Sequence, residues 1–224
     1  MHFMSPDLEK LDALLAELMP FQATLVAVSK TKPEEAISLV YNHGQRIFGE
    51  NYVQELVSKQ ASLPADIMWH FIGHLQSNKV KQIAPFVNLI HGIDSKQLAS
   101  EVSKQAVKFQ RNVDVLLQVY IASEETKFGF SAEEVLPLAI ELINNPLQGL
   151  TIRGLMGMAS FTENESLISS EFKSLKRVYN SISENINAVS FNILSMGMSS
   201  DYKIALNEGS NMVRIGSAIF GGRS

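Results

Sequence analysis

The sequence contains no cysteine, which excludes disulfide bonds, thiolate metal ligands and a cysteine nucleophile. It has no excess of basic residues either, since 19 Lys and Arg stand against 23 Asp and Glu. Proteins that bind nucleic-acid phosphates usually carry a basic surface, so we expect no nucleic-acid partner. No apolar run approaches the length that spans a bilayer, and residues 1–10 lack the apolar core of a secretory signal. We therefore expect a cytoplasmic protein without a membrane segment.

The length and hydrophobicity favour one large domain. The chain has 224 residues, of which 46% are hydrophobic, and no linker rich in Pro, Ser or Gly divides it. We predict a single domain over residues 1–224. It begins with a helix at about residues 5–19, in which leucines recur at helical spacing: Leu8, Leu11, Leu15 and Leu18. Ser5 and Pro6 are interpreted as the N-cap and first-turn proline of this helix.

Short apolar runs alternate with longer helical patterns over residues 22–221. The eight predicted strands cover 22–29, 46–49, 68–73, 87–93, 113–120, 152–156, 191–196 and 212–216. The predicted helices between them cover 33–43, 51–61, 76–84, 95–109, 131–144, 165–186 and 200–208. This alternation predicts an α/β fold with a parallel sheet, and eight units favour a closed TIM-type (β/α)8 barrel over an open sheet. Residues 218–224 are too few for a full outer helix, so we expect the N-terminal helix to take its place.

Lys30 ends the first predicted strand, within Leu25-Val26-Ala27-Val28-Ser29-Lys30-Thr31-Lys32-Pro33. In a barrel the chemistry lies at the carboxyl ends of the strands. Side chains alternate along a strand, so Val26, Val28 and Lys30 share one face and the amine lies at the rim of an apolar surface. Partial burial and a nearby like charge, such as Lys32, favour the neutral amine that forms a Schiff base. The simpler alternative is a solvated charge at a strand end.

Two loops rich in Gly and Ser follow the last two predicted strands, at residues 195–201 and 213–217. In barrels these two loops often hold a phosphate, with Ser199 and Ser200 as extra donors, although helix capping also explains such sequences. Arg214 shares a strand face with Met212 and Gly216, which aims it into the barrel mouth. It could face the ring nitrogen of a heteroaromatic cofactor or pair with a core carboxylate.

Other candidate motifs favour structural roles. His70 and His74 lack the glutamate of a zinc-protease motif, so we interpret them as structural histidines and predict no metal site. Lys127 follows a predicted strand, and a solvated loop charge is its simpler interpretation. Methionines that fill the core and the wall of the pocket are expected at positions 156, 158, 196 and 198.

Several segments of the sequence resemble those of a known family. Besides the stretch around Lys30, the similar segments are Phe48-Gly49-Glu50-Asn51-Tyr52-Val53-Gln54-Glu55, Trp69-His70-Phe71-Ile72-Gly73-His74-Leu75-Gln76-Ser77-Asn78-Lys79, Gly154-Leu155-Met156, Ser195-Met196-Gly197-Met198-Ser199 and Val213-Arg214-Ile215-Gly216-Ser217-Ala218-Ile219-Phe220-Gly221. They occur in the same order over residues 25–221. The chain resembles the pyridoxal phosphate homeostasis proteins (YggS/PROSC type).

The resemblance implies a barrel like the N-terminal domain of alanine racemase, with pyridoxal 5′-phosphate (PLP) held as an internal aldimine. By the matching motifs, Lys30 is the Schiff-base lysine, Asn51 lies beside the cofactor and Arg214 faces the pyridine nitrogen. The phosphate is implied to lie against Ser199, Gly216 and Ser217, and Lys127 matches a lysine with a secondary PLP contact.

The resemblance also implies intracellular PLP (vitamin B6) homeostasis, with no residue assigned a catalytic role. An arginine at the pyridine nitrogen disfavours protonation of that nitrogen, and the chain is too short for the racemases' second domain, so binding is favoured over turnover. The expected partners are PLP and PLP-dependent apoenzymes that accept it, and we expect a monomer. The alternatives are a PLP-dependent amino-acid racemase, a PLP-free Schiff-base aldolase with Lys30 or Lys127 as nucleophile, and an interaction module.

Overall fold

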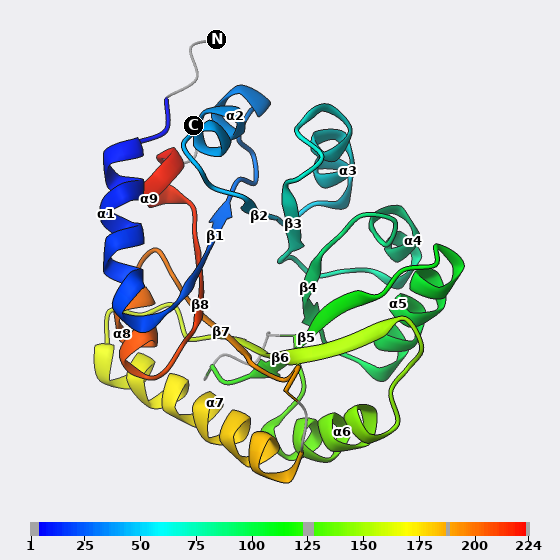
Figure 1. Ribbon diagram of the computed structural model, residues 1–224. Coiled ribbons are helices and arrows are strands. Elements are labelled where there is room, and N and C mark those ends of the chain that lie inside the picture. Colours follow the sequence, from blue (N-terminus) through cyan, green and yellow to red (C-terminus); the bar gives the residue numbers. More distant parts are fainter. Residues whose placement is uncertain (1–4, 123–127, 187–188, 223–224) are drawn as a thin grey trace.

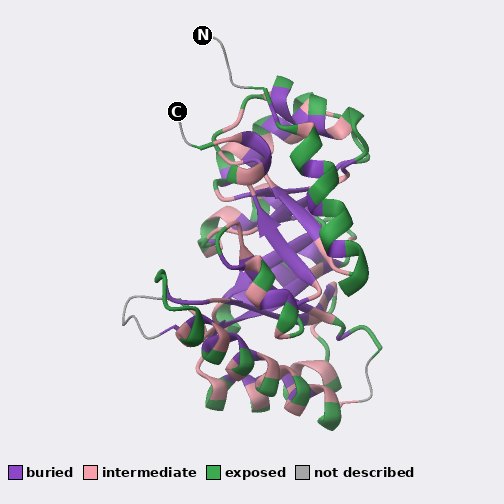
Figure 2. Cartoon of the chain, turned by 90° about the vertical axis from the view of Figure 1, so that its left-hand side faces the viewer, coloured by how far each residue is buried: buried purple, intermediate pink, exposed green. Residues whose placement is uncertain are grey.

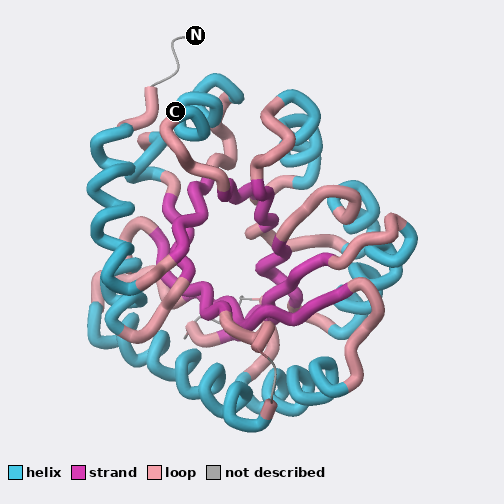
Figure 3. Tube along the Cα trace, in the orientation of Figure 1, coloured by secondary structure: helices cyan, strands magenta, loops and turns pink. Residues whose placement is uncertain are grey.

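A computed structural model describes residues 5–122, 128–186 and 189–222. Its strands form one closed parallel barrel in sequence order, and the pairing of the first strand with the eighth closes the ring (Figures 1 and 3). The strands are β1 (Thr24–Val28), β2 (Ile47–Glu50), β3 (Met68–Phe71), β4 (Leu89–Ile93), β5 (Val113–Tyr120), β6 (Leu150–Met158), β7 (Ile193–Met198) and β8 (Met212–Ile215). This confirms the predicted barrel and all eight strands. Strand β6 is longer than predicted, because it pairs with β5 along its whole length, from Val113↔Leu150 to Tyr120↔Met158.

Helices surround the ring of strands (Figure 3). They are α1 (Leu8–Leu18), α2 (Glu34–Asn42), α3 (Val53–Ser62), α4 (Val80–Ile83), α5 (Lys96–Lys108), α6 (Ala132–Asn144), α7 (Glu165–Asn185), α8 (Tyr202–Asn207) and α9 (Ser217–Phe220), with 3₁₀ turns at Met19–Phe21 and Ser77–Lys79. The predicted helix over 76–84 is thus a 3₁₀ turn followed by α4, and Pro85 prevents its extension. None of the helices in the described part of the chain combines the length and the apolar character that crossing a bilayer requires.

The start of α1 corrects one prediction. Asp7, and not Ser5, is the N-cap, because its carboxylate accepts a hydrogen bond from Lys10 N at 2.9 Å. Ser5 and Pro6 precede the helix. The backbone N–H of Asp7 donates to Ile219 O at 2.8 Å, which ties the start of α1 to α9. As expected, α1 therefore occupies the place beside the short last helix (Figure 1).

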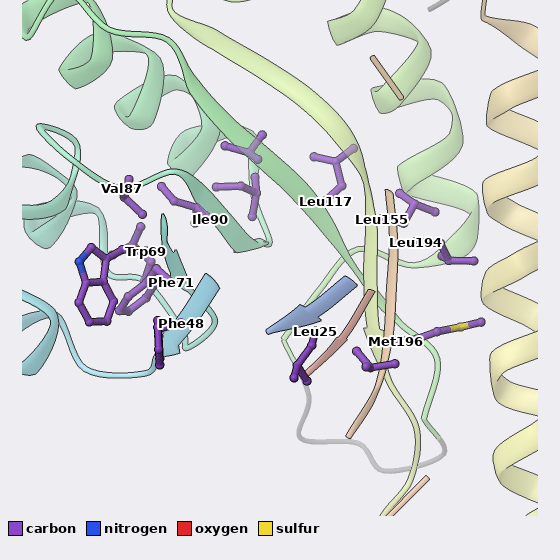
Figure 4. Close-up of a cluster of buried hydrophobic side chains, with 14 of the residues drawn as sticks. Leu25, Phe48, Trp69, Phe71, Val87, Ile90, Leu117, Leu155, Leu194 and Met196 are labelled. Carbon is purple, nitrogen blue, oxygen red and sulfur yellow. The ribbon is translucent and has the colours of Figure 1, made fainter. Parts of the chain in front are cut away.

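The apolar core has two parts, which follow from the alternation of side chains along the strands. One part lies between the barrel wall and the helices and includes Leu25, Phe48 and Trp69 (Figure 4). The other is a smaller cluster inside the barrel: Val26, Leu89, Leu116, Met156 and Met212. Figure 2 shows the buried strands between the more exposed helices. This interior packing fills the barrel below the carboxyl ends of its strands.

Candidate functional site

A cavity of about 510 Å³ opens at the carboxyl ends of the strands. Six of the seven residues predicted to contact a cofactor line it: Lys30, Asn51, Ser199, Arg214, Gly216 and Ser217. Apolar side chains of Val28, Ile72, Met158 and Met198 complete the wall. The seventh, Lys127, lies outside the described residues. The structure thus brings together residues at or just after the carboxyl ends of β1, β2, β7 and β8, which are up to 187 positions apart in the sequence, from Lys30 to Ser217.

Lys30 follows β1 and is half-buried. Val28 and Lys30 both line the cavity, whereas Ser29 between them is buried away from it and donates its hydroxyl hydrogen to Glu50 Oε1 at 2.6 Å. The predicted parity of β1 is therefore confirmed. An amine at the edge of an apolar wall can meet a carbonyl carbon that enters the cavity.

Arg214 is a buried cation at the base of the cavity, with only 5% of its surface exposed. Its Nη1 donates to Ser195 O and Ser195 Oγ, and its Nη2 donates to Gly157 O at 3.2 Å. Among the described residues it forms no ion pair with a carboxylate, so the alternative of a core Arg–carboxylate pair is wrong for that part of the chain. Burial lowers the pKa of Arg214 to about 10, which still leaves it charged at neutral pH. The negative charge of Asp201 opposes this lowering of the pKa without forming an ion pair, so the guanidinium of Arg214 favours a ligand that brings an acceptor atom or a further negative charge.

The loops after β7 and β8 meet on one side of the cavity. The backbone N–H of Gly216 points to Ser199 Oγ at 3.4 Å, and Ser217 begins α9. A Cβ on Gly216 would lie 2.8 Å from Val28 O, so only glycine allows this close approach of β8 to β1. Hydroxyls and backbone N–H groups gathered at one wall are suited to bind phosphate oxygens.

The side chain of Asn51 shows that the cavity suits a polar ligand. Its Oδ1 is buried and has no hydrogen-bond partner among the residues that the structure describes. A buried acceptor without a donor is costly, and a ligand that supplies a hydrogen removes that cost. The residues present fit PLP: an amine for its aldehyde, a cation for its ring nitrogen, and hydroxyls with backbone N–H groups for its phosphate.

A hydrogen-bonded chain continues from Arg214 into the barrel. Ser195 Oγ lies 3.2 Å from His91 Nδ1, and His91 Nε2 lies 3.1 Å from His70 Nδ1. Burial lowers the pKa of His70 to about 3 and also lowers that of His91, so both rings stay neutral at physiological pH. His70 is therefore a structural histidine, as predicted. His74 pairs with Asp94 at 3.2 Å and stacks on Phe128.

A second polar cluster lies behind Lys30, and the sequence analysis missed it. The ammonium group of Lys59 donates to Ser29 O, Glu50 Oε1 and Glu55 Oε1 at 2.8, 2.8 and 2.6 Å. Burial raises the pKa of Glu50, against the opposing effect of Lys59. The spacing of Glu55 and Lys59 by four residues in α3 was the one available sequence signal for this cluster.

Comparisons with known proteins agree with this geometry. The family described as "Alanine racemase, N-terminal domain" matches residues 8–224, so the fold and site define a barrel of that class. The pyridoxal phosphate homeostasis protein of Aquifex aeolicus (strain VF5) is 40% identical over 205 residues, which are 90% of this chain and 87% of the relative. The chain belongs to the family of pyridoxal phosphate homeostasis proteins, as its sequence motifs indicated.

Solved structures show the same similarity. PipY of Synechococcus elongatus PCC7942, determined without PLP, is 35% identical and superposes with a TM-score of 0.89, covering 96% of this chain and 99% of PipY. A second PipY structure, with PLP bound, is 34% identical and has a TM-score of 0.86 over the same shares of the two chains.

Proposed function

We propose that this protein binds PLP in the cavity at the barrel mouth and serves intracellular PLP homeostasis. The amine of Lys30 condenses with the PLP aldehyde and releases one water, so that the cofactor is held covalently but reversibly. The observation that carries the proposal is the convergence of Lys30, Asn51 and Arg214 on one cavity. The relatives that are pyridoxal phosphate homeostasis proteins and the PLP-bound PipY structure support it.

The remaining residues orient the cofactor. Arg214 faces the pyridine nitrogen, with its guanidinium fixed by Ser195 and Gly157. Asn51 offers its unpaired Oδ1 beside the cofactor, and the phosphate binds against the loop residues Ser199, Gly216 and Ser217. Lys127 remains a predicted secondary contact.

Binding and delivery, not turnover, fit the site best. Bound PLP supplies an electron sink, and its strength depends on protonation of the ring nitrogen. A buried arginine that stays charged at neutral pH opposes a second positive charge there. The protein would therefore hold PLP as a cytoplasmic monomer and pass it to PLP-dependent apoenzymes.

The test is the absorption spectrum of the purified protein with added PLP, followed by borohydride reduction and intact-mass analysis. We expect one reduced PLP adduct in the wild type and its loss in Lys30→Ala. Lys96→Ala is the matched control, because Lys96 is an exposed lysine that pairs with Glu141 far from the cavity. An adduct that survives in Lys30→Ala would overturn the proposal.

Two further measurements separate the alternatives. A racemase would exchange the α-proton of an amino acid with solvent, whereas a carrier would not. An aldolase would be colourless with PLP and would be trapped by borohydride only in the presence of its carbonyl substrate.

A further inference from the structure

The backbone that carries Lys30 forms a strained turn. Lys32 N donates to Ser29 O at 3.0 Å, which closes a four-residue turn with Lys30 and Thr31 at its centre. Thr31 has a φ of +64°, in the left-handed region. This position of a turn usually holds glycine or asparagine, and a β-branched residue there is an outlier. Such a conformation persists only when surrounding contacts enforce it.

Helix α3 supplies those contacts. The backbone N–H of Thr31 donates to Glu55 Oε1 at 2.6 Å, and Lys59 Nζ donates to the same oxygen at 2.6 Å. Lys59 Nζ also donates to Ser29 O at 2.8 Å, the oxygen that closes the turn. One buried ammonium group, with 5% of its side chain exposed, therefore joins the first residue of the turn to α3 directly, and joins Thr31 at its centre to α3 through Glu55.

Glu50 completes the cluster at the end of β2. Its Oε1 accepts from Lys59 Nζ at 2.8 Å and from Ser29 Oγ at 2.6 Å. All three hydrogens of the Lys59 ammonium group are thus used within the cluster. The two residues that flank Lys30 are both held from behind, while Lys30 itself lines the cavity.

We propose that Glu55 and Lys59 are positioning residues, which enforce the strained turn at Thr31 and so direct the Lys30 amine into the cavity. This inference rests on the proposed role of Lys30 toward PLP. Neither residue lines that cavity, so both act through the backbone of the turn.

The first experiment compares Glu55→Ala with Glu55→Gln by stopped-flow absorption after mixing with PLP, with wild type as reference. Glu55→Ala removes the acceptor for Thr31 N, and we expect adduct formation to slow by about 10- to 100-fold, the usual effect of a reacting group displaced by about 1 Å. Glu55→Gln retains an Oε1 acceptor and should keep most of the wild-type rate. A wild-type rate in Glu55→Ala would overturn the proposal.

A rescue experiment tests the strain itself. Glycine adopts a positive φ without steric cost, so the turn should form without Glu55 when Thr31 is replaced. Glu55→Ala/Thr31→Gly should therefore recover most of the lost rate. Gln110→Gly in the Glu55→Ala background is the matched control, because Gln110 also has a positive φ, of 53°, but follows α5 far from the turn, and it should not rescue. A Glu55→Ala/Thr31→Gly variant as slow as Glu55→Ala would refute the turn mechanism.

Amide hydrogen exchange gives a readout that needs no PLP. The Thr31 N–H of the wild type should be protected from exchange, and the protection should fall in Glu55→Ala while amides of the barrel strands remain protected. Rapid exchange of Thr31 in the wild type would overturn the inference. Failure of Lys30 to form an adduct, with Thr31 protected, would instead overturn the proposed function and leave the turn as described.

Discussion

Arg214 Nη1 lies 2.6 Å from Ser195 Oγ and 3.0 Å from Ser195 O, so one serine accepts two hydrogen bonds from the arginine. Arginine can only donate, which leaves the hydroxyl hydrogen of Ser195 for His91 Nδ1 at 3.2 Å. His91 must then carry its own hydrogen on Nε2 and donate it to His70 Nδ1. A single direction of donation thus runs from the cavity into the barrel and fixes the plane of the guanidinium group.

Ser195→Ala should release Arg214 from this orientation. We expect a shifted absorption maximum of bound PLP and an affinity lower by about tenfold, equal to about 1.4 kcal/mol, measured by absorption titration. Ser210→Ala is the matched control: Ser210 is a buried serine whose Oγ lies within hydrogen-bond distance of the backbone oxygens of Leu194, Met196 and Met212. It should lose stability but keep the spectrum. An identical spectrum and affinity in Ser195→Ala would refute the role of this contact.

Asn51→Leu should weaken PLP binding without destabilising the PLP-free protein. The side chain of Asn51 keeps a buried acceptor unpaired within the described structure, so an apolar replacement should leave the PLP-free protein equally stable or stabilise it by about 1 kcal/mol. The same change should weaken PLP binding by roughly tenfold, because it removes the acceptor that we propose lies beside the cofactor. Urea unfolding without PLP and absorption titration with PLP measure the two effects.

The control for Asn51→Leu is Asn88→Leu, because the side-chain oxygen of Asn88 already accepts a hydrogen bond within the protein. Asn88 Oδ1 accepts from Trp69 N at 2.8 Å, so Asn88→Leu should destabilise the protein by about 1–3 kcal/mol. If Asn51→Leu destabilised the PLP-free protein as much as Asn88→Leu, Asn51 would have a structural role instead.

Local patterns in the sequence were sufficient to predict the barrel and many of the residues that line the cavity. Apolar runs located all eight strands, and the alternation along β1 placed Val28 and Lys30 on the cavity side. Parity also placed Arg214 in the mouth, since Met212 and Arg214 both face the inside of the barrel. These predictions succeed because each depends on neighbours within a few residues.

The parts that the sequence did not reveal depend on register between distant segments. His91 meets His70 across 21 residues, and Lys59 meets Ser29 across 30. No local pattern encodes such contacts, because the side-chain separation depends on how β3 pairs with β4 and on where α3 packs. The predicted N-cap of α1 was wrong because Ser5 and Asp7 are both residue types that cap helices well. The hydrogen bond from Asp7 N to α9 selects Asp7.

Gly73→Ala should disturb Asn51 through sterics alone. A Cβ on Gly73 would lie 2.4 Å from Asn51 O, a backbone atom that cannot rotate away. We expect the loop after β2 to shift and PLP affinity to fall by about tenfold or more, measured by absorption titration. Gly149→Ala is the matched control, because Gly149 has a φ of +74° at the amino end of β6, away from the cavity. It should lose stability while PLP affinity remains, and equal affinities in the two variants would contradict the prediction.

The buried histidine pair should make stability depend on pH. In the unfolded chain each histidine takes up a proton near pH 6.5, whereas burial keeps the folded pKa of His70 at about 3 and lowers that of His91. Between these values the unfolded state binds more protons, so the free energy of unfolding falls as the pH decreases from about 6.5, by up to about 1.4 kcal/mol per pH unit for each histidine. Urea unfolding between pH 7 and pH 5 measures this slope. His91→Gln should reduce the slope of the free energy of unfolding against pH by the contribution of one proton. Ser210→Ala removes no titrating group, so it should lower the stability without changing this slope. A slope unchanged in His91→Gln would show that His91 is protonated in the folded protein, in which case its Nδ1 would donate to Ser195 Oγ instead of accepting from it.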